Sequence, residues 1–163
     1  MTPRSSLCLS LLAACLLAGE ATADVLTGRV VDALGNGVAG VNIVVDNPNG
    51  SDPTVSNGGT NAGGFFTTTI TPAGVYDITF EPPPPPVTTH LVHEIEGVVV
   101  VATKNLGNVA LPPGVALSGR VLGPTGAPVA GVDLDVIAGG ENMDLRKDQT
   151  DLTGQFLFAS PSG

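Results

Sequence analysis

Four residues in the segment His90 to Glu96 are the first candidates for metal chemistry in this sequence. In His93-Glu94-Ile95-Glu96 the first and last residues have the His-x-x-Glu spacing of a zinc ligand pair. His90 lies three residues before His93, so on a strand the two rings would point to opposite faces. The sequence has no third histidine to close a site. We therefore predict surface residues here, with no metal, no cofactor and no catalytic residue.

Two loops rich in Asp, Asn and Gly offer oxygen atoms, the ligands that calcium prefers. The first, DNPNGSDPTVSNGGTN, contains Asp46 and Asp52, and the second, ENMDLRKDQTD, contains Asp144, Asp148 and Asp151. The first loop lacks the spacing of an EF-hand, and these residue types also form turns. The sequence favours turns in both places, with calcium binding as the alternative.

The first 23 residues have the three parts of a secretory signal peptide. Arg4 supplies the positive charge, LCLSLLAACLLAG is the apolar stretch, and Ala21-Thr22-Ala23 is a small-residue cleavage pattern. The apolar stretch is shorter than the roughly 20 residues that a membrane-spanning helix needs. We predict a signal peptide over 1–23, cleavage near Ala23, no membrane span, and a secreted, cell-surface or periplasmic protein. A lipoprotein signal that acylates Cys15 is the alternative.

The chain beyond this leader is acidic and free of cysteine. Both cysteines, Cys8 and Cys15, lie in the leader, which excludes a disulfide and a catalytic thiol from the processed chain. Without Arg4 and Glu20, 14 acidic and 5 basic residues remain, a net charge of −9. Nucleic acid and anionic membranes attract cationic surfaces. The composition therefore predicts neither as a partner.

A sequence repeat organises the rest of the chain. LTGRVVDALGNGVAGVNIVV from Leu26 recurs as LSGRVLGPTGAPVAGVDLDV from Leu117 at a shift of 91, and TNAGGFF from Thr60 recurs as TDLTGQF from Thr150 at a shift of 90. The identical positions of the longer run are Leu26, Gly28, Arg29, Val30, Gly35, Val38, Ala39, Gly40, Val41 and Val45. Such a repeat indicates two copies of one structural unit. We name residues 24–113 module one and residues 114–163 copy two.

Each copy consists of short runs with period-two alternation, separated by Gly, Pro, Asn and Asp. In module one, the alternation places these side chains on core faces: Val41, Ile43, Val45, Phe66, Thr68, Ile70, Tyr76, Ile78 and Phe80. In copy two it places Val132, Leu134 and Val136 inward, with Asp133 and Asp135 outward. One buried face per strand predicts two sheets packed face to face.

The strand count differs between the copies. Module one should contain about seven strands, near residues 25–31, 41–46, 53–57, 64–70, 75–81, 91–102 and 106–111. Copy two should contain only about four, near 116–122, 132–137, 145–150 and 155–159. Counterparts of VYDITF, GVVVVAT and NVALP are missing from copy two. We expect the chain to begin a longer protein with more repeats, and copy two not to be a stable domain in this chain.

The order of these motifs resembles a known domain family. GRVVDALGNGVAGVNIVV, then Thr-Asn/Asp-x-x-Gly-x-Phe, then TPAGVYDITFEPP, is similar to the carboxypeptidase regulatory-like domain over nearly all of 24–163. The resemblance implies an all-β fold of tandem seven-stranded transthyretin-like (Greek-key) β-sandwiches, the second incomplete. It agrees with Gly35 and Gly126 at positions where a tight turn needs positive φ, and with Gly64 and Gly154 before the Phe-bearing strand.

Enzymes built on related sandwiches use residues that this chain lacks. Tyr76 is the only tyrosine, too few for the ligand set of an intradiol dioxygenase. The tetrapeptide and histidine set associated with hydroxyisourate hydrolases are not visible. Arg29 and Arg120 stand where isopeptide-forming pilin and adhesin sandwiches carry lysine. No nucleophile motif is visible either, and we predict that the protein is not an enzyme.

Two functional classes remain. The first is a structural, spacer or adhesion module of a larger surface or secreted protein, in which EPPPPPV is a stiff connection between sheets. The second is a carbohydrate- or polymer-binding accessory module, and an accessory domain of an exported peptidase is a third, less favoured one. Glycan sites usually stack sugars on exposed aromatics, yet Trp is absent and Phe65 is the only obvious outward aromatic. The sequence therefore favours the spacer, with other surface proteins or a glycan as partners.

Overall fold

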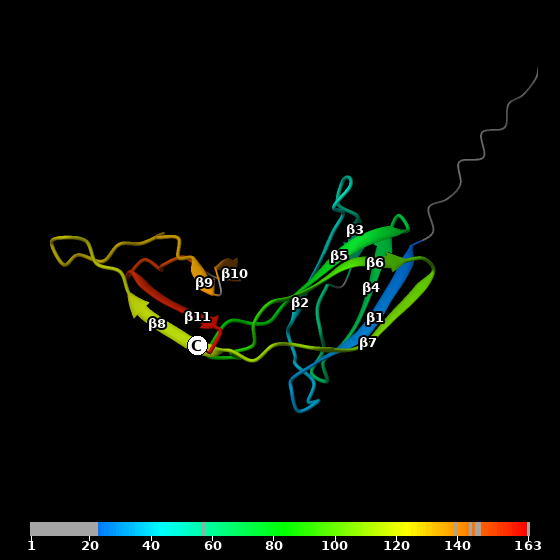
Figure 1. Ribbon diagram of the computed structural model, residues 1–163, viewed down its shortest axis with the longest axis horizontal. Coiled ribbons are helices and arrows are strands. Elements are labelled where there is room, and N and C mark those ends of the chain that lie inside the picture. The colour runs from blue at the N-terminus through cyan, green and yellow to red at the C-terminus, as the bar shows by residue number, and fades with distance from the viewer. Residues whose placement is uncertain (1–22, 57, 139, 144, 146–147, 163) are drawn as a thin grey trace, which may run out of the picture.

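The computed structural model describes residues 23–56, 58–138, 140–143, 145 and 148–162. All regular structure in these residues is β-strand, shown in Figure 1. Residues 1–22 of the predicted signal peptide, with both cysteines, lie outside the described residues. No helix long and apolar enough to cross a membrane is found in the described part of the chain.

Module one is a sandwich of two sheets. Its strands are β1 (Asp24–Val31), β2 (Asn42–Asp46), β3 (Thr54–Ser56), β4 (Phe65–Thr71), β5 (Gly74–Glu81), β6 (His93–Val100) and β7 (Thr103–Ala110). One sheet has the order β3-β4-β1-β7 and the other β2-β5-β6. The seven strands fall close to the predicted ranges, and the predicted sandwich is confirmed.

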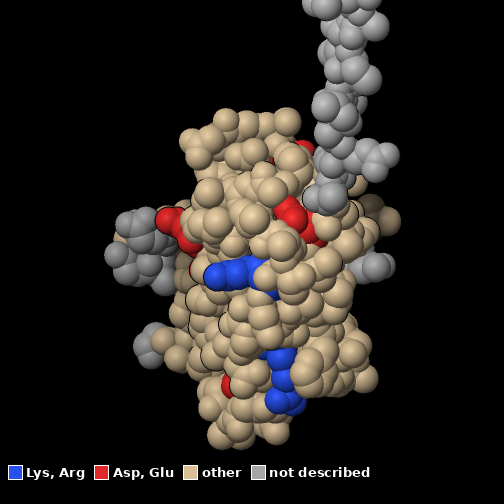
Figure 2. Space-filling view, turned by 90° about the vertical axis from the view of Figure 1, so that its right-hand side faces the viewer, with Lys and Arg blue, Asp and Glu red and all other residues tan. Residues whose placement is uncertain are grey.

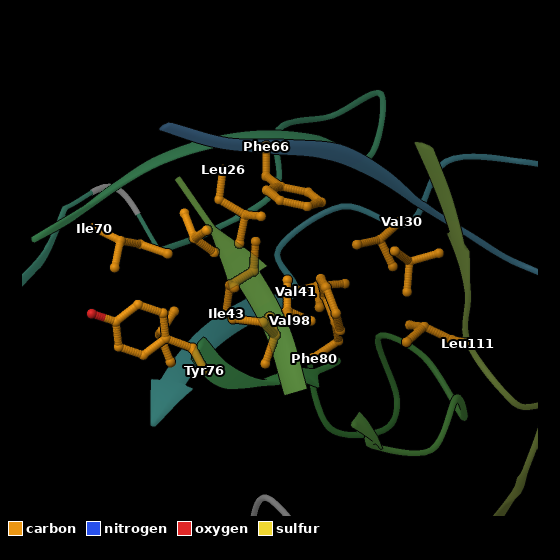
Figure 3. Packing of buried hydrophobic residues seen from close by; sticks show 14 of the residues in the cluster. Leu26, Val30, Val41, Ile43, Phe66, Ile70, Tyr76, Phe80, Val98 and Leu111 are labelled. Atoms are coloured by element: carbon orange, nitrogen blue, oxygen red, sulfur yellow. The ribbon is translucent and has the colours of Figure 1, made fainter. Parts of the chain in front are cut away.

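The core of module one lies between these two sheets, as Figure 3 shows. Phe66 from β4 is 3% exposed, and Tyr76 and Phe80 from β5 are 1% and 0% exposed. The rings of Phe66 and Phe80 meet at 5.7 Å between centroids, so aromatic side chains from the two sheets pack against each other. All nine side chains predicted to face the core of module one are buried: Val41, Ile43, Val45, Phe66, Thr68, Ile70, Tyr76, Ile78 and Phe80.

Copy two contains β8 (Val115–Arg120), β9 (Val136–Ala138), β10 (Glu141–Met143) and β11 (Gln155–Ser160). These strands form two separate pairs, β8 with β11 and β9 with β10. All six residues of β8 are exposed. In module one, the equivalent strand β1 is covered on both edges, by β4 and β7. The second sandwich is therefore incomplete, as predicted.

The described residues of the segment predicted as a strand near 145–150, which are 145 and 148–150, form no strand beyond a bridge at Gln149. The strand near 132–137 is shorter than predicted. Copy two instead has a hairpin of β9 and β10, with Met143 opposite Val136. In module one, β2 pairs along its length with β5, and copy two has no described counterpart of β5. Here β9 pairs with β10, the segment that directly follows it. The isolated bridge Asp133–Gln149 is the equivalent of Asn42–Gly59 in module one, so this part of the arrangement is the same in both copies.

Candidate functional site

The repeated motif builds a buried hydroxyl bridge in module one. Thr60 Oγ1 donates to Val38 O at 2.8 Å and accepts from Val41 N at 2.9 Å. Thr60 is buried, and buried backbone groups need such partners. The hydroxyl therefore ties the start of β2 to the loop that leads to β4.

A second set of bonds fixes the turn before β4. Asn61 Oδ1 accepts from Gly63 N at 2.9 Å and from Phe65 N at 3.1 Å. Arg29 Nε donates to Gly63 O at 3.0 Å, which joins the same turn to β1. The φ of Gly64 is +78°, and a Cβ there would lie 2.3 Å from Val30 O. Glycine is thus required where this turn meets β1.

Copy two repeats the hydroxyl bridge with the same geometry. Thr150 Oγ1 donates to Val129 O at 2.8 Å and accepts from Val132 N at 2.9 Å. Thr150 is 5% exposed. The shared Thr of the repeat therefore has one structural role in both copies.

The second turn is repeated as well, with Asp151 in the place of Asn61. Asp151 Oδ1 accepts from Thr153 N at 2.8 Å and from Gln155 N at 3.0 Å, and Arg120 Nε donates to Thr153 O at 2.9 Å. The motif residues of both copies thus hold a strand and a turn together. The repeat encodes a scaffold, and Arg29 and Arg120 are part of it.

The side chains of the segment from His90 to Glu96 do not come together as a metal site. His90 lies in the connection between β5 and β6, with Nδ1 hydrogen-bonded to Thr88 Oγ1. His93 is the first residue of β6 and lies opposite Phe80, while Glu94 lies opposite Thr79. No group of three or more His, Cys, Asp or Glu that could hold a metal ion occurs among the described residues.

The first acidic loop has the hydrogen bonds of a turn. Asn47 Nδ2 donates to Ser51 O at 3.3 Å, and Asn49 N donates to Asn47 Oδ1 at 3.0 Å. Partial burial raises the pKa of Asp46 above its ordinary value, helped by the negative charge of Asp52. The two carboxylates therefore repel each other.

The second acidic loop is described only in part. Asp144 lies outside the described residues. Asp148 O accepts from Leu134 N at 3.0 Å, and the carboxylate of Asp151 is occupied by its turn. Asp151 thus has the hydrogen bonds of a turn, while Asp148 is bonded through its backbone to Leu134.

A shallow hollow of about 320 Å³ lies on the β3-β4-β1-β7 sheet and is a candidate binding site. It is lined by Thr27, Gly28, Arg29, Phe65, Phe66, Thr67, Asn105, Gly107 and Asn108. The register between β1 and β7 shifts between Thr27 and Arg29, so Leu106 and Gly107 together oppose Gly28. This β-bulge interrupts the sheet at the hollow.

The lining of the hollow suits a neutral or anionic polar ligand. Phe65 is 55% exposed, and the Arg29 guanidinium carbon lies 5.1 Å from the centroid of its ring. Thr27, Thr67 and Asn105 add hydroxyl and amide groups. Figure 2 views the right-hand side of Figure 1, and the surface there is largely uncharged, with few basic and acidic side chains. The hollow offers hydrogen-bonding groups and one ring face, and its lining contains no His, Cys, Asp, Glu or Lys.

Sequence reasoning predicted the exposed ring of Phe65 but missed the other residues of the hollow. The missed signal is Gly107, because a glycine inside a strand often marks a bulge. Its φ is +68°, and Asn105 Oδ1 accepts from Gly107 N at 2.8 Å. The Asn-x-Gly spacing within a strand would have located this feature.

The proline-rich connection has a neighbour that the sequence did not indicate. Pro84 and Pro85 line a second hollow, of about 240 Å³, together with residues of copy two: Gln149, Asp151, Gln155, Phe156 and Leu157. The connection after β5 therefore lies against copy two as well as joining β5 to β6. Figure 1 shows this connection reaching the end of β11.

Comparison with known proteins shows no close relative. No protein-family model matches the chain, and no curated protein matches it. One similar solved structure is a type II cohesin–X-dockerin complex from Acetivibrio cellulolyticus, with 20% identity, 56% of this chain, 58% of that chain and a TM-score of 0.41. Another is the Bacillus anthracis TIE protein, with 18% identity, 86% of this chain, 26% of that chain and a TM-score of 0.40.

The third is a streptococcal ancillary pilin, with 15% identity, 88% of this chain, 52% of that chain and a TM-score of 0.42. In each case the match spans well under two thirds of the other chain. Identities and TM-scores as low as these give no basis for transferring a function. The sandwich itself is established by the strands and sheets of this chain.

Proposed function

We propose that the protein is a non-catalytic, exported β-sandwich repeat protein in which module one acts as a structural spacer or adhesion module of a larger surface or secreted protein. The motifs that resemble the carboxypeptidase regulatory-like domain support this proposal, because their polar residues are bonded within the fold. The leader over 1–23 supports export. Other surface proteins are the partners that such a module would join.

The direction of the first and last strands carries the proposal. β1 pairs in parallel with β7, with Val25 opposite Thr103 and Val31 opposite Ala110. The chain therefore enters module one at one end of this sheet and leaves it at the other. Modules connected in this way extend end to end, which is the geometry a spacer needs.

The test is the length of the protein in solution. A second copy of residues 24–113 inserted between Pro113 and Gly114 should lengthen the particle by about one sandwich, roughly 25–30 Å for an eight-residue strand. Small-angle X-ray scattering measures the maximum dimension. A chain with a Gly/Ser linker of equal length in place of the insert is the control. An insert that folds back and leaves the maximum dimension unchanged contradicts the spacer.

The hollow at the bulge favours a second function, binding of a carbohydrate or another polar polymer. Phe65 is its only exposed ring, and binding of sugars by stacking depends on such a ring. We expect weak or absent binding to a glycan array. A reproducible hit that is lost in Phe65→Ala, and kept in Gln155→Ala at the equivalent position of copy two, would move the protein to the binding class.

A further inference from the structure

The pairing of β1 with β7 closes module one at both of its ends. At the entry, Val25 N donates to Ala102 O at 2.7 Å. Asp24 Oδ1 also accepts from Ala102 N at 2.7 Å. At the exit, Leu111 N donates to Val31 O at 2.9 Å. The two strands that connect the module to the rest of the chain are thus bonded directly to each other.

This arrangement determines how a pulling force would act on the module. Force applied at Asp24 and at Leu111 pulls β1 and β7 in opposite directions along their axes. The hydrogen bonds of a parallel pair are evenly spaced and slanted between the strands, so sliding one strand along the other strains the bonds of a ladder segment together. Separation then requires several bonds to break at once, which is a shear geometry.

The core beneath this ladder adds to its resistance. Leu26 and Val30 of β1 are 0% exposed, and Val109 of β7 and Leu111 are 4% and 2% exposed. Sliding the strands would expose these side chains, at a cost of about 25 cal/mol per Å² of apolar surface. The bulge at Gly107 divides the ladder into two segments, and each segment lies over this core.

The pair of β8 and β11 in copy two has the opposite geometry to the β1–β7 pair. β8 pairs antiparallel with β11, and Val115 lies opposite Ser160. The ends of this pair that lead to Gly114 and Pro161 therefore lie side by side. Force applied at these ends strains one pair of bonds at a time, so the strands unzip.

We propose that module one bears tension, with the β1–β7 ladder as a shear clamp between the entry and exit of the chain. The proposal rests on the spacer function and extends it: the module transmits pulling force along a surface array without unfolding. Forced unfolding is governed by the unfolding rate along the pulled direction. Two pulling directions on one protein can therefore give different forces at the same equilibrium stability.

Single-molecule force spectroscopy on the full chain tests this directly. Cys8→Ser and Cys15→Ser remove the natural thiols, so that only introduced cysteines carry handles. The shear pair is Ala23→Cys with Pro113→Cys. The matched control is Ala23→Cys with Ala73→Cys, which peels β1 from β4 because Asp24 lies opposite Ile70 in that antiparallel pair. All three handle positions are exposed.

We expect the shear pair to unfold at a several-fold higher force than the peeling pair at one loading rate. A third pair, Pro113→Cys with Ser162→Cys, should give the lowest force, since it unzips β8 from β11. Melting temperatures of the handle variants, measured before pulling, should agree with one another, which shows that the handles leave the fold intact. Equal unfolding forces for the shear and peeling pairs would overturn the clamp.

The scattering experiment separates this failure from failure of the spacer. Equal forces with a lengthened particle mean a spacer without a clamp. Different forces with no lengthening mean a mechanically directional module that is not an end-to-end spacer.

Discussion

Module one and copy two share a motif and its hydrogen bonds, yet only module one closes a core around them. Leu26 is 0% exposed in module one, and its equivalent Leu117 is 45% exposed in copy two. The hydroxyl bridge of Thr60 nevertheless recurs at Thr150 with the same two distances. Local sequence is sufficient to specify the bridge and the turn. Burial of the strand beside them depends on partner strands further along the chain.

The comparison of the two copies separates two contributions to stability, the hydrogen bonds of the motif and the burial of the core beneath them. In module one the motif bonds lie over a core, so opening them requires exposing apolar surface. In copy two the equivalent strand β8 is exposed along its whole length, although Phe158 of its partner β11 is 5% exposed. Half a sandwich buries too little to offset chain entropy of about 1–2 kcal/mol per ordered residue. Matched substitutions in the two copies measure the two contributions separately.

The largest effect is expected from removal of the core phenylalanine. Phe66→Ala should destabilise module one by about 3–5 kcal/mol, because it leaves a cavity in a closed core. Phe156 is the equivalent residue of copy two and is only half-buried. Phe156→Ala should therefore leave the unfolding of module one unchanged. Urea denaturation of the full chain, followed by Tyr76 fluorescence, reports on module one alone. An equal loss in the two variants would show that the copies unfold as one unit.

Loss of the bridging hydroxyl should come next. Thr60→Val leaves Val41 N and Val38 O without their partner in a buried place, at a cost of about 1–3 kcal/mol. Thr150→Val removes the same bonds from copy two and should not change the transition of module one. Hydrogen exchange of the Val41 and Val132 amides identifies which bridge has opened. An unchanged midpoint for Thr60→Val would mean that the bridge contributes nothing to the closed core.

Substitutions at two glycines distinguish the cost of a positive φ from the cost of a steric clash. Gly35 has φ +83° with nothing within 4 Å of a Cβ, so Gly35→Ala should cost about 1–2 kcal/mol through its left-handed backbone alone. A Cβ at Gly64 would lie 2.3 Å from Val30 O, so Gly64→Ala must also move β1 away from the turn. Thermal denaturation should show the larger loss for Gly64→Ala. The reverse order would contradict the close approach of turn and strand.

The smallest effect concerns the acidic face of the β2-β5-β6 sheet. Burial, then the charges of Asp52, Asp77 and Glu81, raise the pKa of Asp46 above its ordinary 3.8. When folding raises the pKa of a carboxyl, the folded state binds the proton more tightly than the unfolded state. The free energy of unfolding therefore falls as the pH rises from the ordinary pKa through the raised pKa of the folded state. Asp46→Asn should therefore give a small stabilisation at pH 7 that disappears below the ordinary pKa. Denaturation midpoints at several pH values measure it, and a gain independent of pH would contradict the charge argument.

Period-two alternation predicted the core of module one because each strand has one buried face and one solvent-exposed face. Phe66 and Tyr76 are buried and Phe65 is exposed, as this rule requires. The positive φ values of Gly35 and Gly126 were also predictable, since turn geometry is a local property. These features depend on neighbours in sequence, and the resemblance to a known family agreed with them.

The features that the sequence did not reveal depend on distant partners. Of the segment expected as a strand near 145–150, the described residues 145 and 148–150 form only the bridge at Gln149, because pairing is decided by which strands are present. The hollow at Gly107 depends on the register between the first and last strands, which no local pattern fixes. Likewise, nothing local indicates that Pro84 and Pro85 lie against copy two.

The same motif should be stable in module one and should open easily in copy two. Hydrogen exchange at equivalent amides of the two copies tests this claim most directly. Val30 N donates to Gly64 O at 2.8 Å, and Val121 N donates to Gly154 O at 2.8 Å. Geometry alone would give these two amides equal protection. We predict slow exchange, at the rate of global unfolding, for Val30, and fast exchange by local opening for Val121. Equal protection in a monomeric chain would show that copy two has closed its core in another way, and would contradict the account.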